Sequence, residues 1–453
     1  RIELREYQRD GIEKNQTDDI VEFENDKLLI PSVVPDDFAY NTTPTENYVI
    51  WNADHNGEAI IVGGNTDYTS PIWKPDDITN EIDKMVFVKN TGNCNVYVRI
   101  CFAFEAGNYV RLDRFKQMVR LNKNETDWTW DWVEVEENHV AEIDGTRYFI
   151  AWATYKYPVA PDEHTKISLS QIALDFSAIN DHSRAFGEKY EVKAFAQGIQ
   201  ADGFDSASAA IAKGFDDTIP FKNCKVVEFV TLGDALHHLD GVVSDANKIT
   251  SKVTNVIFGL TDEHKSKVAG RKGVLVANKV NEADFTAYAY YVPTSDGKYD
   301  IYVLADDWKI YAPNASDWLF SGMGSLKKVG TEIFDVSNVT SATHMFDSCK
   351  QLVEIDTSDW KFPKLTTMQL MFVACSSLEE LDVSGWGITN KLTNIEQAFD
   401  GCNALKTLDC SGWDVSKVTT MRWAFRGCKA LTKLDVSGWD VGKSGSFLNM
   451  FTN

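Results

Sequence analysis

Apolar residues in the last third of the chain recur with a nearly fixed period. The motif LDVSGW and its variants end in four tryptophans separated by 26, 27 and 26 residues, namely Trp360, Trp386, Trp413 and Trp439. Upstream of these, four phenylalanines step by the same intervals, at Phe346, Phe372, Phe399 and Phe425. A cysteine follows each phenylalanine by three residues, at Cys349, Cys375, Cys402 and Cys428. Phe320 and Phe451 extend the phenylalanine series at both ends. Such a period is typical of repeat proteins, whose units bury their apolar faces against their neighbours.

Each repeat contains two hydrophobic periods. A spacing of three, four and three residues, as on one side of a helix, joins Val418, Met421, Phe425 and Cys428. The period falls to two in the segment LTKLDV, which predicts a short strand with Leu434 and Val436 inward and Asp435 outward. One strand and one helical turn per repeat predict a C-terminal leucine-rich-repeat α/β solenoid over residues 317–453.

This order of residues resembles the BspA-type leucine-rich repeats of bacterial surface proteins. The resemblance rests on Leu, Asp, Ser, Gly and Trp followed by Met-x-x-x-Phe-x-x-Cys, and it covers about residues 317–453. The first repeat departs from it, with Phe334 in place of the tryptophan and Met323 in place of the cysteine, as expected of a capping repeat. The resemblance implies a non-enzymatic protein that acts in adhesion through an extended face, with a host or bacterial surface protein or a glycan as partner.

Residues 1–222 carry strand patterns punctuated by turn residues. The segment KMVFVKNTGNCNVYVRICFAFEA predicts two strands around the turn NTGN, and further strands are predicted in WVEVEE, TRYFIAWATYKY, KISLSQIALDF and KYEVKAFAQGIQA. One helix is predicted at residues 206–215. Several short strands with alternating apolar and polar residues predict an all-β sandwich or jelly roll.

The same region resembles the TasA/camelysin-like proteins in the order of DKMVFVKNTGNCNVYVRI, YPVAPDEHTKISL and VKAFAQGIQADGFDSASAAIAKGF. The resemblance implies export through a SipW-type signal peptidase. A chain that begins with Arg1 rather than Met has either lost a signal peptide or been excised from a longer sequence. It also opens an alternative, a fibre subunit of a biofilm matrix that polymerises through its β-domain. The opening strand RIELREY alternates well enough to pair with another subunit, but its four charges suit a protected edge and favour a monomer over a fibre.

Between these regions, residues 223–316 predict a small α+β connector that caps the first repeat. Strands are predicted in VVEFVTL and TNVIFGLT, a helix in LGDALHHLDGVV, and a hairpin that turns at Asp296 and Gly297. The chain of 453 residues is thus expected to form three domains, at 1–222, 223–316 and 317–453.

Net charge narrows the class of partner. The chain has 45 basic and 67 acidic residues, a formal net charge of −22, which disfavours nucleic acids and anionic membranes. No stretch of 18 apolar residues occurs, so no membrane span is expected. A secreted, extracellular or surface-associated protein is the prediction.

The sequence offers little catalytic chemistry. It lacks the nucleophile-elbow, phosphate-loop, zinc-protease and EF-hand motifs, so no enzyme, cofactor or metal site is predicted. Acidic residues beside Trp128, Trp130 and Trp132 allow a glycan-binding or glycosidase site, although core tryptophans near a solvated loop are the plainer interpretation.

One acidic series is a possible ligand face, formed by Asp356, Asp382, Asp409 and Asp435. Stacked carboxylates repel one another, and three interpretations remain. Each aspartate accepts hydrogen bonds from its own following turn, the row binds a cation or ligand, or it is an acidic surface without a role.

The repeat cysteines allow two interpretations as well. Equivalent positions in successive repeats predict a ladder of buried, reduced thiols, and Cys410, in place of the motif valine, is expected to lie in the core too. A metal site would need ligands that converge on one point.

Overall fold

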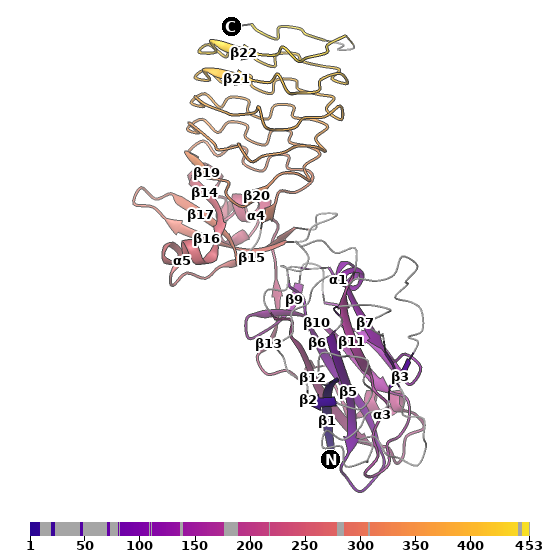
Figure 1. Ribbon diagram of the computed structural model, residues 1–453. Coiled ribbons are helices and arrows are strands. Elements are labelled where there is room, and N and C mark those ends of the chain that lie inside the picture. Colours follow the sequence, from indigo (N-terminus) through magenta and orange to yellow (C-terminus); the bar gives the residue numbers. More distant parts are fainter. Residues whose placement is uncertain are drawn as a thin grey trace. The chain divides into compact units, whose positions relative to one another are not determined.

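The computed structural model describes residues 1–9, 20–22, 46–48, 70–72, 80, 82–107, 109, 111–135, 139–175, 189–216, 218–278, 285–306, 309–442 and 446–452. The chain divides into two compact units, residues 1–227 and 228–453 (Figure 1). Each is described by itself.

The first unit is built from two β-sheets. One antiparallel sheet has the order β2 (Ile20–Glu22), β1 (Ile2–Arg9), β5 (Ile82–Asn90), β11 (Leu169–Leu174) and β7 (Val119–Lys123). The other has the order β12 (Val192–Gln200), β6 (Val96–Glu105), β10 (Thr146–Tyr155), β9 (His139–Ile143) and β13 (Cys224–Glu228), and β8 (Trp128–Trp132) also pairs with β10. A separate pair joins β3 (Glu46–Tyr48) to β4 (Ser70–Ile72). The described residues of this unit also include the helices α1 (Leu112–Met118) and α3 (Ala207–Gly214).

The apolar core of this unit lies between the sheets. It takes Val86 and Leu169 from one sheet and Phe102, Phe104 and Ala151 from the other. The turn NTGN therefore connects strands of different sheets, since β5 and β6 are not neighbours. The all-β character expected for residues 1–222 agrees with this arrangement in part, and the helix predicted at 206–215 is confirmed as α3. The strand predicted in WVEVEE is wrong for residues 133–135, because β8 ends at Trp132.

The second unit begins with a mixed sheet. Its order is β15 (Val274–Asn278), β16 (Phe285–Pro293), β17 (Tyr299–Ala305), β14 (Val253–Leu260) and β19 (Lys328–Gly330). The predicted hairpin is confirmed, because β16 and β17 pair antiparallel and Gly297 in their turn has φ 77°. The helices are α4 (Leu232–His237) and α5 (Thr261–Val268), with 3-10 turns η1 (Leu239–Gly241), η2 (Asp245–Asn247) and η3 (Thr250–Lys252). One continuous apolar core extends from Leu232 to Met450, so this sheet and the repeats share their interior.

The α/β solenoid predicted for residues 317–453 is wrong. The described residues of this region form no helix, and their strands are short: β19, β20 (Phe334–Asp335), β21 (Thr407–Asp409) and β22 (Lys433–Asp435). Two small parallel pairs, β18 (Ile310–Tyr311) with β20 and β21 with β22, remain separate sheets. Successive repeats instead stack as turns joined by isolated parallel bridges, such as Ser341 to Thr367 (Figure 1).

The hydrogen bonds explain why the helix-like spacing does not form a helix. In the second repeat, alternate amides donate to the next repeat: His344 N to Gln369 O at 3.0 Å, Phe346 N to Met371 O at 2.7 Å and Ser348 N to Val373 O at 2.9 Å. The amides between them close turns three residues back, as from Cys349 N to Phe346 O at 3.2 Å. An α-helix would need each of these amides to donate four residues back. Consecutive turns therefore produce the three-four-three spacing.

The periodic core residues form ladders along the stack. Neighbouring phenylalanine rings are nearly parallel, with centroids 5.1 Å apart for Phe346 and Phe372 and 5.6 Å apart for Phe399 and Phe425. Phe320 and Phe451 continue the ladder at its two ends, as their spacing predicts. A second ladder is made by the motif tryptophans, of which Trp386 and Trp413 stack at 5.9 Å.

Candidate functional site

The aspartate row (Asp356, Asp382, Asp409 and Asp435) projects from equivalent positions of four repeats. The Oδ1 atom of each aspartate accepts the backbone N–H of the serine two residues later, at 3.0 to 3.1 Å. In the first three, the serine hydroxyl also donates to that oxygen at 2.7 Å. Hydrogen bonds from these serines hold the pKa values of Asp356, Asp409 and Asp435 below their usual range. Each carboxylate thus closes its own turn.

A shallow cavity of about 330 Å³ lies between Asp382 and Asp409. Glu380, Thr407 and Lys433 also line it. Three carboxylates and one ammonium give this hollow a net negative charge, so it would accept a polar or cationic group rather than an anion.

A second row of outward residues was missed by the sequence reasoning. Equivalent turn positions adopt positive φ, between 53° and 64°, in six successive repeats; this turn row consists of Trp318, His344, Leu370, Gln397, Trp423 and Asn449. The left-handed region is unfavourable for residues other than glycine and asparagine. Residue propensities do not reveal this row from the sequence, because the side chains at the six positions are chemically unrelated.

Two tryptophans of the turn row reach the surface. Trp318 is 51% exposed, and its ring stacks on His344 with centroids 3.7 Å apart. Trp423 is half-buried and lies beside two guanidinium groups, Arg422 at 4.5 Å and Arg426 at 4.7 Å from its centroid. Arg426 is held in place because its Nε donates to Asp400 Oδ1 at 2.9 Å. Aromatic faces paired with cations are common anchors in protein and glycan recognition.

A larger cavity, of about 570 Å³, borders Trp318. His237, Lys248 and Thr250 line it. His237 fixes the backbone there, because its Nε2 lies 3.2 Å from Trp318 O and 3.1 Å from Leu319 O, while its Nδ1 lies 3.0 Å from Thr250 Oγ1. Burial lowers the pKa of His237, so the neutral ring is favoured.

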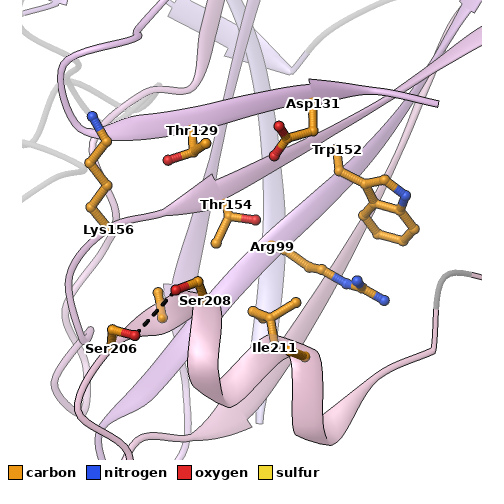
Figure 2. A pocket seen from close by; sticks show the side chains of 11 residues that line it. Arg99, Thr129, Asp131, Trp152, Thr154, Lys156, Ser206, Ser208 and Ile211 are labelled. Atoms are coloured by element: carbon orange, nitrogen blue, oxygen red, sulfur yellow. Dashed lines mark hydrogen bonds between the residues drawn. The ribbon is translucent and has the colours of Figure 1, made fainter. Parts of the chain in front are cut away.

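The first unit holds a pocket of about 440 Å³ between α3 and the outer face of β8 and β10 (Figure 2). Figure 2 shows Thr129 and Asp131 of β8, Thr154 of β10, and Ser206 and Ser208 beside them. The sequence reasoning also missed this pocket, because its residues come from segments far apart in the chain.

A buried arginine forms one wall of the same pocket. Arg99 stacks on Trp152 at 3.9 Å, and it donates to Gln197 Oε1 and to Asp216 O, both at 2.7 Å. These bonds hold the guanidinium within the fold.

The tryptophans of the acidic loop belong to the core. Trp128 is buried, Trp130 stacks on Phe102 at 5.1 Å, and Trp132 contacts Phe104. Asp131 lies between them in sequence and therefore faces the opposite side of β8. Among the described residues, Asp131 and the tryptophans therefore lie on opposite sides of β8, and the tryptophans pack in the core; residues 136–138 of the acidic segment lie outside the described residues.

The repeat cysteines are buried free thiols, as predicted. Each thiol reaches the carbonyl of the phenylalanine one repeat earlier, as from Cys375 Sγ to Phe346 O at 3.1 Å and from Cys428 Sγ to Phe399 O at 3.1 Å. Burial raises the pKa of Cys428 to about 12 and also raises those of Cys349, Cys375, Cys402 and Cys410. These thiols are therefore protonated and spread along an axis, and they do not form a metal site.

Comparison with known proteins gives one match, confined to the repeats. Residues 314–406 and 382–453 are similar to the family described as "Mycoplasma protein of unknown function, DUF285". No curated protein and no solved structure matches the chain. The match supports a repeat family for the C-terminal region, whereas the BspA-type and TasA/camelysin-like assignments stay predictions. No helix among the described residues is long and apolar enough to cross a membrane.

Proposed function

We propose that this chain is a non-enzymatic surface or matrix protein, exported from the cell, that binds a protein or glycan partner through the turn row of its repeats. The similarity to the DUF285 family supports a surface-type repeat protein.

The observation that carries the proposal is the placement of Trp318 and Trp423. Core packing does not require a tryptophan at these turns, because Gln397 and Asn449 occupy equivalent positions with similar φ values. The left-handed conformation costs about 1–2 kcal/mol at a tryptophan as at other residues of the row, and the exposed ring of Trp318 does not offset this cost by packing in the core. Local strain combined with exposure favours a binding role over a structural one.

The flanking charges indicate what the row would bind. Arg422 and Arg426 lie over the Trp423 ring, so a partner would meet guanidinium groups stacked on the indole, and these favour a carboxylate or a sugar ring. The net charge of −22 would repel polyanions, so the proposal disfavours nucleic acid as the partner.

The test uses the full chain on immobilised extracellular-matrix proteins and on an array of host and bacterial glycans. Asparagine tolerates positive φ and already occupies residue 449, so Trp318→Asn and Trp423→Asn remove the rings without disturbing the backbone. The double variant should bind on the order of tenfold or more weakly, as expected for aromatic anchors. Val353→Ala, at an exposed position outside the row, is the matched control.

Two results would contradict the proposal. Binding that survives both substitutions, or that is lost on mutating Asp131 in the first unit, would place the working surface elsewhere. Cleavage of any glycan on the array would show that the protein is an enzyme and would contradict the proposal of a non-enzymatic binding protein.

A further inference from the structure

A cluster of metal-ligating side chains lies outside both rows, where the mixed sheet meets the first repeats. β14 and β19 run parallel, with Ile257 opposite Gly330. The carboxyl ends of both strands lie at the same edge of the sheet. The segment from Gly259 into α5 therefore passes the turn after β19 that contains Glu332. This register brings together Glu263, His264 and Glu332, whose ligand atoms all lie within 4.8 Å of one another.

The imidazole of His264 is placed by a glycine. A Cβ atom on Gly259 would lie 2.4 Å from His264 Cδ2 and Nε2, so the ring occupies space that any other residue would fill. Tyr302 lies nearby, with ring centroids 5.8 Å apart. The side chain of His264 is only 21% exposed, and its position is therefore restricted by the fold.

The ring nitrogen that faces the carboxylates has no hydrogen bond. His264 Nε2 is inaccessible to solvent and without a hydrogen-bonding partner among the described residues. It lies 3.9 Å from Glu332 Oε2, which is too long for a hydrogen bond. Buried polar atoms are nearly always satisfied, so an unpaired imidazole nitrogen within 4.8 Å of two carboxylate oxygens is suited to bind a cation between them.

We propose that Glu263, His264 and Glu332 bind a divalent transition-metal ion, Zn²⁺ in particular. One imidazole and two carboxylates match the ligand preference of zinc, and three protein ligands leave a fourth position for water or a partner group. The imidazole disfavours Ca²⁺ and Mg²⁺, which prefer all-oxygen sites. The ion would compensate two negative charges and satisfy His264 Nε2, while small side-chain rotations would bring the donor atoms to the usual distances of about 2.0–2.2 Å.

The site would connect α5 to the turn that leads into β20. Because metal binding to the folded state stabilises it, Zn²⁺ would hold the mixed sheet against the repeats of the same unit. This role is independent of the turn row.

Calorimetric titration of the chelator-treated full chain with ZnCl₂ tests the proposal. The expected result is one equivalent of Zn²⁺ bound, with no comparable binding of CaCl₂ or MgCl₂. His264→Ala and Glu332→Gln should each weaken zinc binding on the order of 100-fold, while their thermal unfolding without metal stays close to that of the parent. Gly259→Ala keeps all three ligands but displaces the imidazole, and it should weaken binding as well.

Glu354→Gln is the matched control, because Glu354 is an exposed carboxylate outside the cluster and outside both rows, and the substitution should not affect the titration. A parent chain that binds no Zn²⁺ would overturn the proposal. Zinc binding that persists in both His264→Ala and Glu332→Gln would overturn it too, since that metal would be held by other acidic groups.

Discussion

The phenylalanine ladder provides an internal comparison between a buried ring and an exposed one. Phe399 is 1% exposed and stacks between Phe372 at 5.7 Å and Phe425 at 5.6 Å. Phe451, at the last described repeat, is 60% exposed and stacks only on Phe425 at 5.7 Å. The two residues have the same chemistry and phase in the repeat but differ in burial.

Phe399→Ala should reduce the free energy of unfolding by about 3–5 kcal/mol, because it leaves a cavity inside the stack. The two lost ring contacts, each worth ~0.5–1.5 kcal/mol, account for about 1–3 kcal/mol of this loss, and the cavity and the lost burial account for the rest. Phe451→Ala loses one such contact and little burial, so the expected change is about 0.5–1.5 kcal/mol.

Thiol labelling across a denaturant series measures this difference within the repeats alone. Cys349, Cys375 and Cys402 are buried there, and mass spectrometry of their peptides reports opening of the repeats separately from the first unit. Phe399→Ala should shift the labelling midpoint of all three cysteines to lower denaturant. Equal shifts for Phe399→Ala and Phe451→Ala would refute the reasoning, since burial would then not determine the contribution of a ring.

Three further predictions concern thiols, protons and assembly. Without denaturant, Cys349, Cys375, Cys402 and Cys428 should resist a thiol reagent, because burial raises their pKa values; rapid modification of all four would contradict the ladder. Burial raises the pKa of Glu105 to about 7, so the folded state binds the proton more tightly than the unfolded state, and the free energy of unfolding should fall as pH rises from about 4.3 to 7. Glu105→Gln should remove this decline in thermal melts measured across that pH range. An unchanged pH profile in the variant would count against the raised pKa. The full chain should sediment as a monomer, because both edges of β1 are already paired, one with β5 and the other with β2. Deletion of residues 1–8 should destabilise the first unit, because it also removes Glu6, which lies 2.7 Å from the buried Lys84 and neutralises it. Filaments formed by the parent chain would favour the fibre alternative.

The sequence predicted the repeat period because buried residues must keep phase. Phe320 and Phe451 lie where their spacing places them, although neither belongs to a complete motif. It did not predict the backbone between them. Consecutive turns with amides such as Phe346 N donating to the next repeat produce the same apolar spacing as a helix. The two conformations differ only in the carbonyl to which each amide donates its hydrogen bond, and side-chain hydrophobicity does not encode that choice.

The sites depend on register, which a single sequence specifies weakly. The zinc ligands meet because Ile257 pairs with Gly330, and the pocket of the first unit forms because Thr154 lies opposite both Thr129 and Arg99 on neighbouring strands. A shift of one residue in the second pairing would separate these pocket side chains onto opposite faces, and a shift in the first would move Glu332 along the sheet relative to α5. The hydrogen bonds of the aspartate row could be predicted from the sequence because they are local: each donor serine lies two residues after its aspartate.

The repeats separate the residues that fix the fold from those that are free to vary. Inside the stack, equivalent positions repeat phenylalanine, cysteine and tryptophan, since every ring or thiol must fit the one before it. At the turn row, equivalent positions hold chemically unrelated side chains on the same backbone conformation. Amides of this row donate to the next repeat, as from Trp423 N to Leu448 O at 3.1 Å, and these bonds maintain the positive φ whatever the side chain. A surface whose conformation is independent of its side chains can present a tryptophan, a glutamine or an asparagine without refolding, which is the property that a recognition face requires.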